Sequence, residues 1–271
     1  MSSISGVLAA EPGGGEGTGM HMPSIDELYP EPFWRIGTWF EFNRLDLVRL
    51  IAIGAVVLLV YLGARRTRMV PGRGQSTFEL AVGFVHHQIA ETAMPPAMAR
   101  RYLPFIAWIF FSVLALNLTG VIPFLNVSSN ALVAVPMILA VCAWIAFVAQ
   151  GIRAHGAGHY FADALFPKGA PKIMYALLTP IELLSTFILR PVTLCVRLMA
   201  NMIAGHFLLT AFFMMTSYLF LQASGLVKTV GILTSAASLV FVLFEIFVAC
   251  LQAYIFALLT SVYIGLAKEE H

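Results

Sequence analysis

Charged side chains are scarce in this chain: they make up 11% of its 271 residues, while hydrophobic residues make up 59%. The mean hydropathy is +0.86. Soluble domains carry about a quarter charged residues, so this composition excludes an ordinary soluble protein and predicts an integral membrane protein. The formal net charge is only +2, and no basic stripe is interleaved with aromatic residues, so we expect no nucleic-acid partner.

Cysteine is also rare, and Cys142, Cys195 and Cys250 lie far apart in separate apolar stretches. Such an odd, scattered set argues against a disulfide framework or a zinc cluster, and we interpret the three as small apolar core residues. His155 and His159 have the spacing of a helical metal pair, but the Gly-Ala-Gly between them disfavours a helix. We therefore expect neither a metal site nor a cofactor.

Motifs for covalent chemistry are absent as well. The sequence contains no phosphate-binding loop, nucleophile elbow or paired-carboxylate hydrolase pattern, so we expect no catalysis by the chain alone. It lacks the basic start and apolar centre of a secretory signal, and we expect a bacterial plasma membrane as its location. Residues 1–44, rich in glycine, proline and acids, are predicted as an extracytoplasmic N-terminal segment, and residues 45–271 as the integral membrane domain.

Five apolar stretches are each long enough to cross about 30 Å of hydrocarbon. They predict an all-α polytopic membrane protein. The loops after the first and third stretches are rich in arginine and lysine, which places those loops in the cytoplasm. Because five crossings are an odd number, the N-terminus is then expected outside and the C-terminus in the cytoplasm. The stretches are residues 45–62, 103–122, 132–152, 191–221 and 230–267.

Residues 77–93 carry apolar side chains at helical spacing but are too polar to span a membrane. This pattern is typical of an amphipathic helix that lies on the membrane surface, here on the cytoplasmic side. We expect His86 and His87 to belong to the solvated face of this helix.

The last two apolar stretches are unusually long, at about 31 and 38 residues. As helices they would measure roughly 45 and 57 Å, whereas an upright span needs only about 20 residues. We predict two long, strongly inclined helices that form a hairpin over residues 173–267. The alternative is that each stretch contains a kink and partly leaves the bilayer. Strong inclination has to be enforced by a neighbouring surface, which predicts a large partner.

Arg197 lies in the middle of this hairpin sequence. A cation at that depth costs roughly 2.5–3.5 kcal/mol on insertion scales, and guanidinium does not escape the cost by losing its proton. We therefore expect a functional role for Arg197. Asn201 follows it by four residues and shares its helical stripe, and Gln252 of the second helix is a candidate partner for both.

His206 and Glu245 form a second candidate pair in the hairpin. His206 is nine positions after Arg197 and so faces the opposite side of the helix. Both side chains are suited to a proton relay, because ionisable groups at this depth usually mark an ion route. The alternative for the histidine and the amides is a plain interhelical hydrogen bond.

Three stretches of the chain resemble signatures of one known family, the a subunit of the rotary F-type ATP synthase. They are residues 190–206 (RPVTLCVRLMANMIAGH), residues 251–260 (LQAYIFALLT) and residues 117–123 (NLTGVIP). The likeness extends over about residues 40–271. It implies five transmembrane segments, an inclined terminal hairpin against a ring of c subunits, two offset aqueous half-channels, and a complex that includes the b subunit of the peripheral stalk.

The same resemblance implies roles for individual residues. Arg197 matches the essential arginine that acts as the proton gate, and Asn201 and Gln252 match its polar neighbours facing the rotor. His206 and Glu245 match a proton-path pair that is exchanged in some relatives. Glu182 falls near a half-channel acid, offset by about one position. The acid that some relatives carry near the end of the second span is absent here, so that part of the entry route is not implied.

A self-contained secondary transporter or ion channel is the alternative class. Such a protein usually carries internal repeats and broken helices around a substrate cavity, and no repeat relates the two halves of this sequence. A passive membrane scaffold would give no reason for Arg197.

Overall fold

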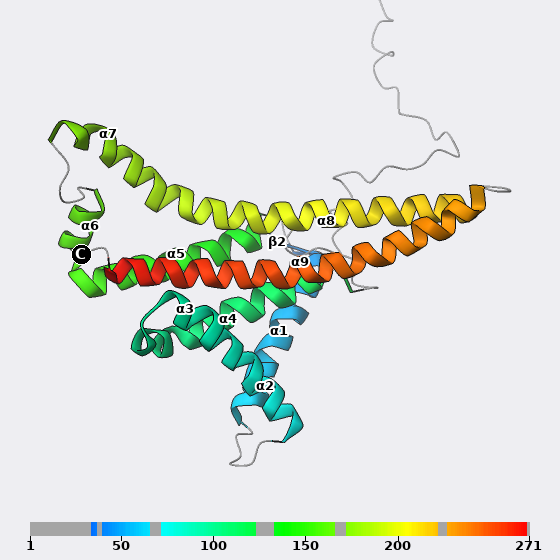
Figure 1. Cartoon of the computed structure of the whole chain (residues 1–271), viewed down its shortest axis with the longest axis horizontal. Coiled ribbons are helices and arrows are strands. Elements are labelled where there is room, and N and C mark those ends of the chain that lie inside the picture. The colour runs from blue at the N-terminus through cyan, green and yellow to red at the C-terminus, as the bar shows by residue number, and fades with distance from the viewer. Residues whose placement is uncertain are drawn as a thin grey trace, which may run out of the picture.

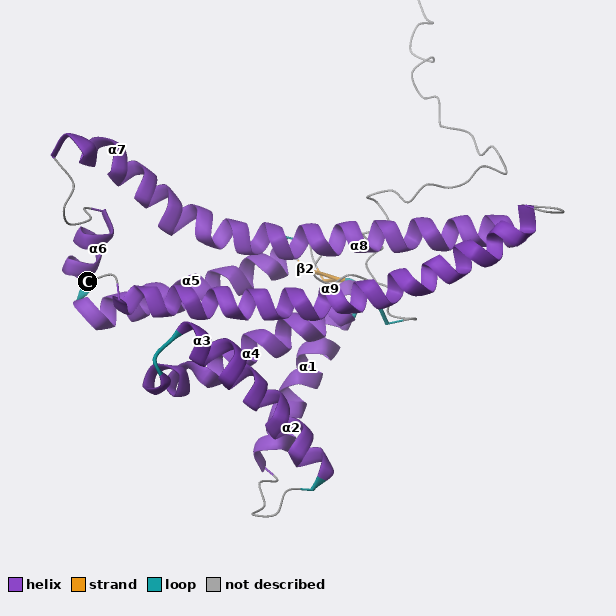
Figure 2. Ribbon diagram, viewed as in Figure 1, coloured by secondary structure: helices purple, strands orange, loops and turns teal. Residues whose placement is uncertain are grey.

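The computed structural model describes residues 34–36, 40–65, 72–122, 133–165, 172–221 and 227–269. Two three-residue strands, β1 (Trp34–Ile36) and β2 (Phe40–Phe42), pair antiparallel, and nearly all other described residues are helical (Figure 2). Most of the predicted N-terminal segment lies outside the described residues.

Five helical segments of the described chain are long and apolar enough to span a membrane, which confirms the all-α polytopic fold. The second span begins seven residues before the predicted stretch, because Arg100 and Arg101 lower the hydropathy of its first turns. Pro96 favours this start, since proline at the first helical position needs no N–H partner. The spans are α1 (Arg44–Arg65), α4 (Pro96–Leu118), α5 (Ala134–His155), α7–η3–α8 (Lys172–Leu183, Leu184–Leu189, Arg190–Leu221) and α9 (Val227–Glu269).

The helices α8 and α9 run side by side and form the predicted long hairpin (Figure 1). Helix α8 continues backwards through the π-helix η3 into α7, so the apolar segment covers 45 residues, Leu177–Leu221. At its α7 end this continuous helix diverges from α9 (Figure 1). The predicted hairpin range, residues 173–267, includes this extension, but the apolar stretch was predicted to begin only at residue 191, because Glu182 and the polar residues near it interrupt the apolar run.

Helix α9 also forms the packed core of the protein together with α4 and α5. Ile106 and Ile109 of α4, Phe147 of α5, and Phe256 and Ile264 of α9 are all buried in one cluster. Between membrane helices such a core is stabilised by van der Waals contacts of the fitted side chains, since lipid is as apolar as the side chains themselves. One half of α9 is therefore held by the core, while the other half is paired mainly with α8.

The amphipathic segment predicted over residues 77–93 consists of three elements: α2 (Arg73–Phe84), the π-helix η2 (Val85–Ala90) and α3 (Glu91–Ala93). Val85 and Ile89 are fully buried in the core cluster. The segment lies so close to α9 that a Cβ atom at Gly265 would meet the carbonyl oxygen of Ala93 at 2.5 Å. Helical periodicity predicted the buried face but not the π turn.

A sharp corner joins α5 to α6 (Ala157–Leu165). Gly156 lies in the corner with φ 81°, a conformation that favours glycine. The ring of Tyr160 then folds back over Gly151, where an added Cβ would overlap it. Tyr160 is itself buried in the core, so the corner anchors α6 to the end of α5.

Candidate functional site

A hydrogen bond between two amide side chains links the helices of the hairpin. Asn201 Nδ2 of α8 donates to Gln252 Oε1 of α9 over 2.8 Å. Gln252 is 3% exposed, whereas Asn201 is exposed on the outer surface of α8. The structure thus brings together two of the residues that the sequence singled out as polar neighbours.

Glu245 lies two helical turns before Gln252 on the same stripe of α9 and is only 7% exposed. Its Oε1 atom is 3.1 Å from the position that a Cβ atom would take at Gly205 of α8. Glycine therefore makes the room that this carboxylate occupies. Within the described residues, the buried Oε2 atom of Glu245 has no hydrogen-bond partner.

His206 follows Gly205 directly, so the carboxylate of Glu245 contacts the neighbour of the predicted relay histidine. The His206 side chain is half-buried, and its backbone carbonyl accepts a hydrogen bond from Thr210 Oγ1 over 2.7 Å. The pairing of His206 with Glu245 stays a prediction. Glu182, near the end of α7, is half-buried and about 22 Å along the helix from Arg197 at 1.5 Å per residue.

A cavity of about 240 Å³ lies between α8 and α9 beside these polar groups. Four polar side chains line it: Asn117, Asn201, Glu245 and Gln252. Asn117 comes from the end of α4 and donates through Nδ2 to the carbonyl of Ala249 over 3.4 Å. Sequence reasoning missed Asn117 as a site residue, although a buried amide in an apolar span was a usable signal. Arg197, His206 and Glu182 are not among the lining residues.

Arg197 is exposed and makes no ion pair with an acid among the residues that the structure describes. Helix α8 packs through other residues of the same turns, Leu194, Cys195 and Leu198, which are all buried. Arg197 is therefore open to contact from outside its own chain. The exposed positions Arg197, Asn201, Ala204 and Leu208 follow the spacing of one helical stripe.

Arg190, about two helical turns before Arg197, has a different environment. Its Cζ atom lies 5.2 Å from the ring centroids of both Phe147 in α5 and Tyr263 in α9. A guanidinium over an aromatic face is held by cation–π attraction. Arg190 thus ties the start of α8 to the core, a role that sequence reading did not predict because its aromatic partners are distant in sequence.

The fold and the site together define a polytopic membrane protein with polar and ionisable side chains enclosed between two long apolar helices. The sequence pattern of the family described as "ATP synthase A chain" matches residues 47–265. The chain therefore belongs to this family, the a subunits in the membrane sector of F-type ATP synthase, which serve proton transport and ATP synthesis. This assignment replaces the alternative of a self-contained transporter.

Curated relatives agree over almost the whole chain. The "ATP synthase subunit a" of Rhodococcus erythropolis is 44% identical over 253 residues, which cover 93% of this chain and 92% of the relative. The protein of the same name from Parafrankia sp. is 36% identical over 275 residues, covering 100% and 90%. That of Gluconacetobacter diazotrophicus is 36% identical over 239 residues, covering 88% and 92%.

Proposed function

We propose that this chain is the stator subunit through which protons reach and leave carboxylates on a rotating ring of c subunits. Two offset aqueous half-channels would serve the two sides of the membrane. The N-terminus lies outside and the C-terminus in the cytoplasm of a bacterial plasma membrane, and the b subunit of the peripheral stalk holds the chain against rotation. The observation that carries this proposal is the exposure of Arg197 on α8, without an acidic partner among the described residues.

The electrostatic argument concerns the partner of Arg197. A permanent cation within a 45-residue apolar segment is costly in hydrocarbon and is stabilised by an opposite charge. Because no described acid of this chain pairs with it, the counter-charge comes from outside, and a carboxylate on the rotor supplies it. Asn201 presents an exposed amide one helical turn from Arg197 and adds a hydrogen bond to the ionised rotor acid, while the buried Gln252 holds that amide in place.

Proton transfer then follows from the charge states of the rotor acid. A proton from the outer half-channel, relayed past His206 and Glu245, neutralises the acid and lets it turn through lipid. At the inner half-channel the acid loses the proton and is attracted by Arg197, which also blocks direct leakage between the half-channels. Glu182 is assigned to the proton path as a half-channel acid. Each charge that crosses 100 mV contributes about 2.3 kcal/mol, so several protons drive one synthesis step.

The test is ATP-driven proton pumping by the complex reconstituted in vesicles, comparing Arg197→Ala with Arg153→Ala. Arg153 is an exposed arginine in the last turn of α5 and serves as the matched control. Arg197→Ala is expected to abolish pumping while the soluble part still hydrolyses ATP, and Arg153→Ala is expected to pump normally. Intact pumping by Arg197→Ala would rule out the gate role.

A further inference from the structure

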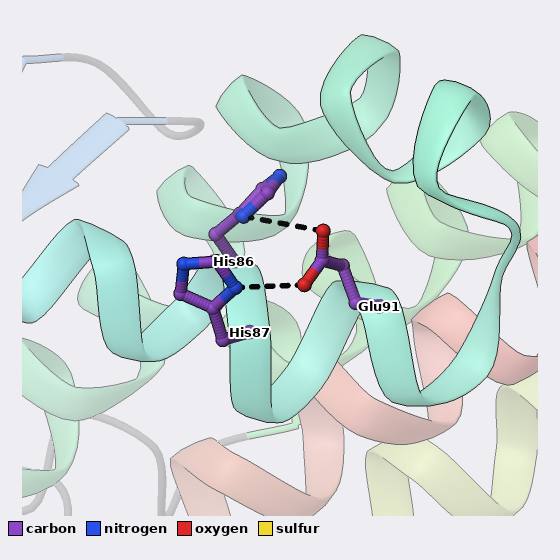
Figure 3. A group of neighbouring side chains, drawn as sticks. All are labelled: His86, His87 and Glu91. Carbon is purple, nitrogen blue, oxygen red and sulfur yellow. Dashed lines mark hydrogen bonds and ion pairs between the residues drawn. The ribbon is translucent and has the colours of Figure 1, made fainter.

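A compact group of three potential metal ligands lies on the segment between α2 and α4. Figure 3 shows the imidazoles of His86 and His87 directed at the single carboxylate of Glu91. His87 Nδ1 is 2.7 Å from Glu91 Oε2, and His86 Nδ1 is 3.7 Å from Glu91 Oε1. The ligand atoms of the three residues lie within 4.8 Å of one another. This cluster is separate from the residues of the α8–α9 cavity.

The π-helix η2 produces this arrangement. In an α-helix a residue five positions further on is rotated by about 140°, so His86 and Glu91 would face different directions. Here the backbone N–H of Glu91 donates to the carbonyl of His86, five residues earlier, which is the hydrogen bond of a π turn. The wider turn brings Glu91 over His86, while His87 reaches the same carboxylate at the ordinary four-residue spacing.

The backbone around the cluster is held in place by buried neighbours. Val85, Ile89 and Ala90 of η2 are fully buried in the core. The His86 side chain is 14% exposed and that of His87 66% exposed. One imidazole is therefore fixed by the fold, and the other is open to solvent. The sequence prediction that both histidines belong to a solvated face is correct for His87 only.

The donor set and its spacing fit a transition metal. Two imidazoles and one carboxylate form a known ligand set for Zn²⁺ that leaves a fourth position for water. Bonds of about 2.0–2.1 Å at tetrahedral angles separate donor atoms by about 3.4 Å, so donor atoms that lie within 4.8 Å of one another need shifts of at most about 1.4 Å. A glutamate carboxylate is ionised at neutral pH, as a metal ligand has to be.

We propose that His86, His87 and Glu91 form a three-ligand binding site for a divalent transition metal, with Zn²⁺ as the ion that the ligand set suits best. The bound ion would join the turns of η2 and α3 and so stiffen the segment that packs against Gly265 of α9. This proposal does not depend on the proton path described above. The competing explanation is an ordinary surface ion pair between His87 and Glu91.

The experiment measures Zn²⁺ bound to the purified, chelator-treated ATP synthase complex at a series of buffered free-zinc concentrations. The wild type is compared with Glu91→Gln and His87→Ala. Glu79→Gln is the control, because Glu79 is an exposed acid of α2 outside the cluster. Wild type and control are expected to bind one more zinc ion per copy of this chain than either cluster variant, or to bind it at least about tenfold more tightly.

Equal zinc binding by the wild type and both cluster variants would overturn the proposal and leave only the surface ion pair. If Glu91→Gln does not assemble into the complex, the largely exposed His87 gives the same test through His87→Ala. X-ray absorption of the zinc-loaded wild-type complex provides a second readout without any substitution. A fit without imidazole nitrogen at about 2.0 Å would also reject the site.

Discussion

The close approach of α9 to α3 leads to a prediction for Gly265→Ala. The added Cβ would lie 2.5 Å from the carbonyl oxygen of Ala93 and 3.3 Å from Cγ of Met94. An ordinary carbon–oxygen contact is about 3.3 Å or longer, so one segment has to move by about 0.8 Å. The neighbouring oxygen belongs to the backbone and has no side-chain torsion through which to yield. We therefore expect the whole α3 turn to shift.

The size of the effect follows from two opposing contributions. Overpacking a fitted contact costs about 1–3 kcal/mol. Alanine in place of glycine within a helix returns about 0.5–1 kcal/mol by restricting the unfolded chain. The middle values of the two ranges leave a net loss of about 1.3 kcal/mol in the free energy that keeps α3 closed on α9. That loss corresponds to an increase of about tenfold in the open population.

Hydrogen–deuterium exchange of the purified complex measures this opening directly. Backbone amides of residues 91–98 are expected to exchange about ten times faster in Gly265→Ala. The matched control is Gly83→Ala in α2, where an added Cβ meets nothing within 4 Å, and which is expected to leave exchange unchanged or slower. Unchanged exchange in Gly265→Ala, or equal acceleration in both variants, would refute the close-contact reasoning.

The remaining predictions concern the polar side chains of the hairpin. A double-mutant cycle of Asn201→Ala and Gln252→Ala, measured by equilibrium unfolding in mixed detergent, is expected to give a coupling energy of about 0.6 kcal/mol and at most about 1.7 kcal/mol. Additive effects of the two single substitutions would contradict the 2.8 Å hydrogen bond between these side chains. His206→Glu and Glu245→His are each expected to lower ATP-driven proton pumping, whereas the double exchange restores part of it by re-forming an acid–imidazole pair. A double variant no better than the single ones would argue against that pairing.

Much of the fold could be predicted because hydropathy and helical period report directly on membrane spans. The five spans and the long hairpin agree with the structure. The start of α4 and the junction of α7 with α8 were missed, since a helix continues through charged residues as long as its backbone hydrogen bonds do. The π turns were also missed, because the spacing of apolar residues does not distinguish a π turn from a turn of α-helix.

The candidate site was predictable within each helix and less so between helices. Their spacing alone predicted that Glu245 and Gln252 lie on one stripe of a helix, and in the structure both side chains line the same cavity. The register and rotation of α8 against α9 decide which groups meet, and these depend on contacts such as the fit of Glu245 against Gly205. Asn117 reaches the cavity from a third helix, and no feature of its own stretch indicates which neighbour it will meet.

The two glycines at the end of α5 work as one unit. Gly156 reverses the chain with φ 81°, and Gly151 leaves the space that the returning Tyr160 ring occupies. A bulkier residue at either position removes the benefit of the other. Without the turn at Gly156 the Tyr160 ring does not reach Gly151, and with a side chain at residue 151 the ring has no space to pack. Evolutionary drift at this bend is therefore expected to proceed by concerted replacement rather than by independent single steps.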